Sequence, residues 1–110
     1  ECPAQFVETR HGKFAFHVEG PANAPAVVCV HGSNVSRKQW IFPTPPKDVR
    51  IVAISRPGYG ESDEIDPGKF EYEMIADIVK AVLDQLSIDK FHVMGHSGGG
   101  PHAVAIKALL

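Results

Sequence analysis

The spacing of hydrophobic positions changes along the chain and predicts strands first and helices later. Residues 6–10 and 13–19 are rich in β-prone side chains. The second segment alternates, with Phe14, Phe16 and Val18 on one face. A two-residue period is the pattern of a half-buried strand, so the two segments predict an antiparallel hairpin.

Three short runs are apolar on consecutive positions rather than on alternate ones. They are residues 26–30, 49–54 and 91–94. Strands that are covered on both faces, as in a parallel sheet, have this pattern. We therefore expect these runs to be buried parallel strands.

A helical period lies between the second and third of these runs. Apolar positions recur in residues 70–86 at spacings of three and four, which predicts a helix with one buried stripe. The stripe consists of Tyr72, Ile75, Ile78, Val79, Val82 and Leu86. Shorter helices are predicted at residues 36–42 and from Gly99 to the end of the chain. This alternation predicts an α/β fold in one domain across residues 1–110.

Composition and charge narrow the range of functions. The 110 residues are 44% hydrophobic and 22% charged, which is typical of one modest globular domain. The net charge of -2 comes from scattered residues, so there is no basic face for nucleic acid, and a small-molecule partner is the better expectation. The longest apolar run is far shorter than the ~18 residues of a transmembrane helix. We expect a soluble protein without a transmembrane segment.

Cysteines and histidines indicate neither a disulfide framework nor a metal centre. Cys2 and Cys29 are too few for a framework, and Cys29 has the pattern of a small core side chain. This count slightly favours a reducing, cytoplasmic location. His11, His17 and His92 have no second ligand at metal spacing, so we expect no metal and no cofactor.

One turn carries the strongest candidate chemistry. The segment Gly95-His96-Ser97-Gly98-Gly99 lies between an apolar run and the last predicted helix, so it is a strand-to-helix turn that presents a serine. The pattern G-x-S-x-G needs small residues beside the serine, because the backbone of the turn crowds the adjoining strand and helix. Ser97 is therefore the candidate nucleophile, with Gly95 and Gly99 as structural residues of the turn.

A second turn, His31-Gly32-Ser33-Asn34, follows the first apolar run. Sites in parallel sheets lie beyond the carboxyl ends of the strands, so this turn and the serine turn are expected to open on one rim. There the backbone N–H groups of Ser33 and Gly98 can form an oxyanion hole. We assign His31 and Gly32 a structural role, with the His31 ring anchoring nearby loops rather than acting as a base.

Together these motifs resemble the first half of an α/β-hydrolase. The resemblance rests on His31-Gly32, on Arg-Pro-Gly-Tyr-Gly-Glu-Ser at 56–62 and on residues 95–102, and it covers nearly all of the chain. It implies the N-terminal part of that fold, an antiparallel hairpin leading into a mostly parallel sheet flanked by helices. It also implies a serine hydrolase in which Ser97 attacks an ester or related small carbonyl substrate and forms an acyl-enzyme.

The remaining catalytic groups of that family follow the nucleophile in chain order, first an acid and then a general-base histidine. The sequence ends at Leu110, thirteen residues after Ser97. The resemblance therefore implies a partial domain whose isolated form has little hydrolytic turnover. We also expect an open sheet edge along residues 91–94 that favours self-association.

Several alternatives stay open. The chain can be a non-catalytic binding module of the same fold or a truncated product, and a perhydrolase or C–C bond hydrolase uses the same residues. Arg56, Tyr59 and Glu61 can contact a substrate, although a Pro-Gly-x-Gly loop favours a scaffolding role. Trp40 and Phe42 can line a pocket or cover the sheet.

Overall fold

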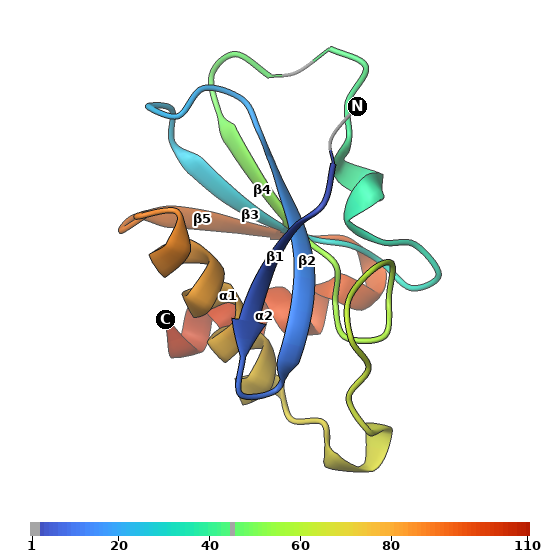
Figure 1. The fold of residues 1–110 in the computed structure, drawn as a ribbon. Helices are drawn as coiled ribbons and strands as arrows, with labels where there is room; N and C mark the ends of the chain where they lie inside the picture. The colour runs from blue at the N-terminus through green and yellow to red at the C-terminus, as the bar shows by residue number, and fades with distance from the viewer. Residues whose placement is uncertain (1–2, 45) are drawn as a thin grey trace.

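A mixed five-stranded sheet forms the centre of the computed structural model, which describes residues 3–44 and 46–110 (Figure 1). The strands are β1 (Gln5–Thr9), β2 (Gly12–Glu19), β3 (Ala26–Val30), β4 (Arg50–Ile54) and β5 (Phe91–Gly95). Their order in the sheet is β1-β2-β4-β3-β5. The β1–β2 and β2–β4 pairs are antiparallel, and β3 pairs in parallel with both β4 and β5. This confirms the predicted α/β class, with a hairpin that leads into parallel strands.

The register of the parallel strands places three loops at one edge of the sheet. Val30, the last residue of β3, pairs with Ile54 at the end of β4 and with Gly95 at the end of β5. The loops that leave these three strands therefore start side by side. As predicted, the serine turn and the His31 turn share this rim.

Two α-helices cover one face of the sheet, and the other face has a thinner cover. The α-helices are α1 (Tyr72–Gln85) and α2 (Gly100–Leu109). Three short 3₁₀ helices are η1 (Arg37–Trp40), η2 (Pro67–Lys69) and η3 (Ser97–Gly99). The helix predicted at 36–42 is thus a single 3₁₀ turn, and the last helix begins with one. No helix in the described ranges is long and apolar enough to cross a membrane.

The main core lies between the sheet and the two α-helices. It combines β-strand side chains such as Phe14 and Phe16 with the buried stripe of α1 and with Ile106 of α2. A smaller cluster on the opposite face consists of Cys29, Ile51 and Ala53, with Trp40 packed against it. Trp40 therefore covers the sheet. Phe42, by contrast, is exposed, and Cys2 lies outside the described residues.

The burial of β5 differs from the sequence prediction. We expected residues 91–94 to be buried on both faces, yet no residue of this strand is buried, and Met94 is 52% exposed. The physical reason is that β5 is an edge strand with β3 as its neighbour on one side. A run of consecutive apolar residues is compatible with a strand covered on both faces. It does not show that other elements actually cover those faces.

Tyr72 also departs from its predicted position on the buried stripe of α1. It is 45% exposed, whereas Ile75, Ile78 and Val79 are buried. Tyr72 is the first residue of the helix, where the chain is still approaching the sheet. Its ring packs edge-on against His102, with centroids 5.0 Å apart, instead of joining the main core.

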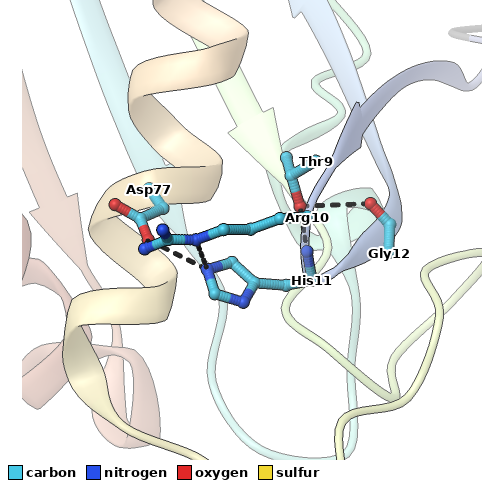
Figure 2. A network of polar contacts seen from close by, with 5 residues as sticks. All are labelled: Thr9, Arg10, His11, Gly12 and Asp77. Atoms are coloured by element: carbon cyan, nitrogen blue, oxygen red, sulfur yellow. Dashed lines mark hydrogen bonds and ion pairs between the residues drawn. The ribbon is translucent and has the colours of Figure 1, made fainter.

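The tip of the β1–β2 hairpin is tied to α1 by a polar network (Figure 2). Within the turn, the His11 backbone N–H donates to Oγ1 of Thr9, which itself donates to the Gly12 carbonyl. Oδ2 of Asp77 lies 2.8 Å from Nη2 of Arg10 and 2.9 Å from Nε2 of His11. The His11 hydrogen bond, and then Arg10, hold the pKa of Asp77 below its usual value. The network fixes the hairpin against the helix that packs on the same sheet.

The exposed β5 edge leads to a prediction about the 110-residue chain made alone. We expect this chain to associate, because an apolar edge strand presents unpaired N–H and C=O groups. Sedimentation velocity should show species larger than a monomer, and Met94→Lys should shift the distribution toward monomer. The matched control is Phe6→Lys on β1, the opposite edge, which should cause no shift. A wild-type chain that sediments as a monomer would contradict the prediction.

Candidate active site

Three loops meet at the rim formed by the carboxyl ends of β3, β4 and β5 (Figure 1). The turn after β5 is joined to β3 by a hydrogen bond of 3.1 Å from the His96 N–H to the Val30 carbonyl. The turn after β3 is held by a bond of 3.0 Å from the Gly32 N–H to Oε1 of Gln39. The first bond fixes the serine turn to β3, and the second fixes the turn after β3 to the 3₁₀ helix η1.

Ser97 stands in a strained backbone conformation at the tip of the turn. Its φ is 52°, in the left-handed region that non-glycine residues rarely occupy. The residue is exposed, and the turn closes with a bond of 2.8 Å from the Gly99 N–H to the His96 carbonyl. Strain of this kind in a strand-to-helix turn lifts a serine hydroxyl above the sheet.

Close backbone approach explains the glycines on both sides of Ser97. A Cβ atom built on Gly95 would lie 2.7 Å from the Gly99 carbonyl oxygen and 2.9 Å from the Cβ of Ala103. A Cβ atom on Gly99 would overlap the Val30 carbonyl oxygen and would lie 2.6 Å from that of His31. All of these separations are far below ordinary van der Waals contact. The turn therefore has this geometry only with glycine at positions 95 and 99.

The backbone of Ser33 lies directly against that of Gly98. A Cβ atom built on Gly98 would lie 2.5 Å from Oγ of Ser33 and 3.4 Å from its backbone nitrogen. In the described part of the chain neither of these two N–H groups donates to a protein acceptor. Two free amides beside a serine hydroxyl can stabilise an oxygen atom that becomes negatively charged.

His31 is fully buried beneath this rim. Its Nε2 accepts a hydrogen bond of 2.9 Å from the Arg56 N–H, so its Nδ1 is the donor to the Gly32 carbonyl at 2.7 Å. The Tyr59 ring packs edge-on against it, with centroids 4.9 Å apart. Burial, followed by the nearby Arg56, lowers the pKa of His31. The ring thus links the turn after β3 to the loop after β4.

The loop after β4 is held by further polar contacts. Oγ of Ser62 donates to the Ser55 carbonyl at 2.7 Å and accepts from the Ala15 N–H at 2.8 Å. Glu61 pairs with the buried Arg37 at 3.1 Å. These contacts agree with the scaffolding role expected for Glu61, because its carboxylate is directed to a neighbouring loop.

Sequence reasoning missed the contact between Arg56 and His102. Nη1 of Arg56 lies 3.0 Å from Nε2 of His102, and both residues are buried and line a cavity of about 270 Å³. From the sequence, Arg56 has no assigned partner, and His102, five residues beyond Ser97 on the last helix, is expected to face its neighbours rather than to act as the base. The available signal was weak: an arginine directly after a buried strand, and a histidine five residues beyond the serine.

The described residues contain neither a general base for Ser97 nor a metal cluster. In residues 3–44 and 46–110 no histidine or carboxylate is hydrogen-bonded to the Ser97 hydroxyl. Over the same ranges, no three His, Cys, Asp or Glu side chains gather as metal ligands. The rim therefore combines a presented serine with free amide donors.

Comparison with known proteins identifies the family. Residues 25–108 match the sequence model of the alpha/beta hydrolase fold. The match covers most of the chain, and the chain belongs to the α/β-hydrolase family.

Curated relatives with a similar sequence are hydrolases. The chain is 31% identical over 111 aligned residues to a 2-hydroxy-6-oxononadienedioate/2-hydroxy-6-oxononatrienedioate hydrolase of Cupriavidus pinatubonensis. This alignment covers 93% of this chain and 38% of the relative. It is 38% identical over 85 residues to the hydrolase of the same name from Klebsiella pneumoniae, covering 72% and 30%. The chain thus spans only 38% and 30% of the length of these two relatives.

Solved structures agree with the fold assignment. The naproxen esterase of Bacillus subtilis superimposes with a TM-score of 0.79 at 28% identity, over 96% of this chain and 38% of that one. An epoxide hydrolase of Vigna radiata gives a TM-score of 0.83 at 19% identity, over 99% and 36%, and shows the fold alone. The same arrangement of elements is thus present in hydrolases with different substrates.

The glycine contacts predict a sharp difference between two similar substitutions. Gly95→Ala should lower the free energy of unfolding by about 1–3 kcal/mol, because its methyl group meets backbone and Ala103. Gly100→Ala is the matched control, since a Cβ there meets nothing within 4 Å. It should be neutral or stabilising by up to about 1 kcal/mol. Urea unfolding measures both, and equal effects would refute the close-packing argument.

Buried histidines predict a loss of stability in mild acid. Burial, and then Arg56, lowers the pKa of His102 from 6.5 to about 4, and burial also lowers the pKa values of His17 and His31. Because the folded state disfavours the charged form, their contribution to stability is complete above pH 6.5 and is lost as the pH falls from there toward 4.

Urea midpoints at about pH 7.5 and about pH 5 measure this effect, and the midpoint should be lower in acid. His102→Asn should reduce the difference between the two values. Identical midpoints at both pH values in the wild type would contradict the expected linkage.

Proposed function

We propose that this chain carries the nucleophile and the oxyanion hole of a serine hydrolase that acts on a carbonyl substrate. In this proposal Ser97 Oγ attacks the carbonyl carbon, and the N–H groups of Ser33 and Gly98 bind the oxygen as it becomes negative. The tetrahedral intermediate collapses to an acyl-enzyme as the leaving group departs, and water then cleaves the acyl-enzyme. The same two amides stabilise the second tetrahedral intermediate.

The left-handed backbone of Ser97 is the observation that carries this proposal. A φ of 52° is strained for a residue with a side chain, and although Ser87 reaches 57° just after the end of α1, at Ser97 the strain falls in a turn between a strand and a helix. The strain is supported by tight packing around Gly95 and Gly99, and it presents the hydroxyl beside two free amides. Membership of a family whose similar members are hydrolases supports the same function.

The proposed reaction needs a group that takes the proton of Ser97. In the family such a histidine follows the nucleophile in chain order, together with an acid. In the described ranges no side chain holds that position. We therefore propose that the 110-residue chain by itself has little turnover, since a triad that lacks its base loses most of its rate.

Hydrolysis of a carbon–carbon bond beside a ketone is a second candidate within the same chemistry. The substrates named for the curated relatives carry an oxo group, a hydroxyl and two carboxylates, but no ester. The naproxen esterase supports ester hydrolysis instead. In both cases the attacked atom is a carbonyl carbon, so the roles of Ser33, Ser97 and Gly98 are the same.

Covalent labelling tests the role of Ser97. The native protein, as its source produces it, should react with a fluorophosphonate at Ser97, and Ser97→Ala should abolish labelling and lower turnover of an activated ester by about 10⁴-fold or more. Ser87→Ala is the matched control, because Ser87 is also exposed and has a φ of 57°. It should leave labelling unchanged. A folded native protein that takes no label would favour the non-catalytic binding module.

A further inference from the structure

The guanidinium of Arg56 is buried without a negatively charged partner. Arg56 is only 7% exposed. Its Nη1 contacts His102, and its Cζ lies 4.8 Å from the centroid of the Tyr59 ring. The buried atoms Nε and Nη2 have no hydrogen-bond partner. No ion pair to Arg56 is formed in the described part of the chain, whereas the exposed Arg10 pairs with Asp77.

His102 adds another unpaired donor at the same place. Arginine can only donate, so Nε2 of His102 must accept the bond from Arg56, and Nδ1 then carries the hydrogen. Nδ1 is buried and has no partner. Because burial, and then Arg56, lowers the pKa of His102 to about 4, the ring is neutral at physiological pH and keeps this arrangement. The two residues thus present three buried nitrogen atoms whose N–H groups have no acceptor, and a buried donor without an acceptor is costly.

These residues stand between an apolar cavity and the serine turn. Arg56 and His102 line the cavity of about 270 Å³ together with Pro57, Ile65, Pro67 and Phe70. Nη2 of Arg56 lies 3.6 Å from a Cβ atom built on Gly98, whose backbone nitrogen belongs to the proposed oxyanion hole. The guanidinium therefore lies beside the serine turn, and its buried nitrogens become available to a molecule at Ser97 when the side chain turns toward the cavity that it lines.

We propose that Arg56 and His102 bind a carboxylate of the substrate and make the site selective for acidic carbonyl compounds. The apolar part of the substrate lies along the cavity wall formed by Pro57, Ile65 and Phe70. A carboxylate has acceptors only, so it can take the free N–H groups of both residues, and its charge balances the guanidinium. This inference rests on the proposed function, since it names the substrate class of the same rim.

Equilibrium binding tests the inference without turnover. The native protein carrying Ser97→Ala is titrated by calorimetry with 4-oxo-4-phenylbutanoate, which has a ketone, an aromatic ring and a carboxylate. The uncharged probe is the corresponding carboxamide. We expect the carboxylate to bind about 10- to 100-fold more tightly than the carboxamide, as a charge-assisted hydrogen bond in a buried site should give.

Arginine variants assign this preference to one side chain. Arg56→Met in the same background should remove the preference by weakening carboxylate binding alone. Arg10→Met is the matched control, because it removes the same charge from an exposed arginine outside the cavity. It should leave both affinities unchanged. Arg56→Lys keeps the charge without the planar fork and should show an intermediate loss, which keeps the test decisive if Arg56→Met does not fold.

Two results would overturn the inference. One is equal binding, or no binding, of the two probes by the Ser97→Ala protein. The other is an equal loss of carboxylate affinity in Arg56→Met and Arg10→Met, which would reduce the effect to net charge. If a carboxylate of the protein itself neutralised the Arg56 guanidinium, the carboxylate probe would have no advantage over the carboxamide, which is the first of these results. The outcome is separate from the proposed function, since fluorophosphonate labelling of Ser97 does not need the carboxylate site.

Discussion

The close approach of two backbone segments, the end of β3 and the turn after β5, is the constraint on which the rest of the rim depends. The carbonyl group of Val30 accepts from the His96 N–H and stands where a Cβ of Gly99 would be. Any side chain at Gly99 would push the serine turn away from the sheet. The left-handed backbone of Ser97 and the contact between Ser33 and Gly98 would then be lost together.

Buried polar side chains hold the other loops of the rim at the cost of desolvation. His31 bonds to the turn after β3 and to the loop after β4, and Arg37 bonds to the more exposed Glu61. A half-buried ion pair such as Arg37–Glu61 adds little net stability, because desolvation offsets most of its attraction. The effect of these contacts is geometric, since each bond fixes one loop against another. Arg56 has two buried nitrogens, Nε and Nη2, without a hydrogen-bond partner, and it lines the cavity beside the serine turn.

The fold alone does not identify a substrate. An esterase and an epoxide hydrolase share this arrangement of strands and helices at TM-scores of 0.79 and 0.83, so selectivity must arise from the side chains around the serine turn. On this rim the distinctive group is the unpaired guanidinium beside an apolar wall. It connects the general chemistry of a presented serine to one class of molecules.

The sequence by itself determined the local elements, whereas the tertiary structure decided how they are covered and joined. Periodicity predicted the β1–β2 hairpin, the buried strands β3 and β4 and the helix α1, and the glycine pattern predicted the serine turn, because these depend on neighbours in sequence. The resemblance predicted the open edge of β5, but periodicity did not predict that the faces of this strand are exposed, since an apolar run does not say what covers it. Periodicity also placed Tyr72 in the core, and no pattern paired Arg56 with His102. The packing of Tyr72 and of Arg56 against His102 depends on how α1 and α2 lie against the loop after β4, which no local pattern encodes.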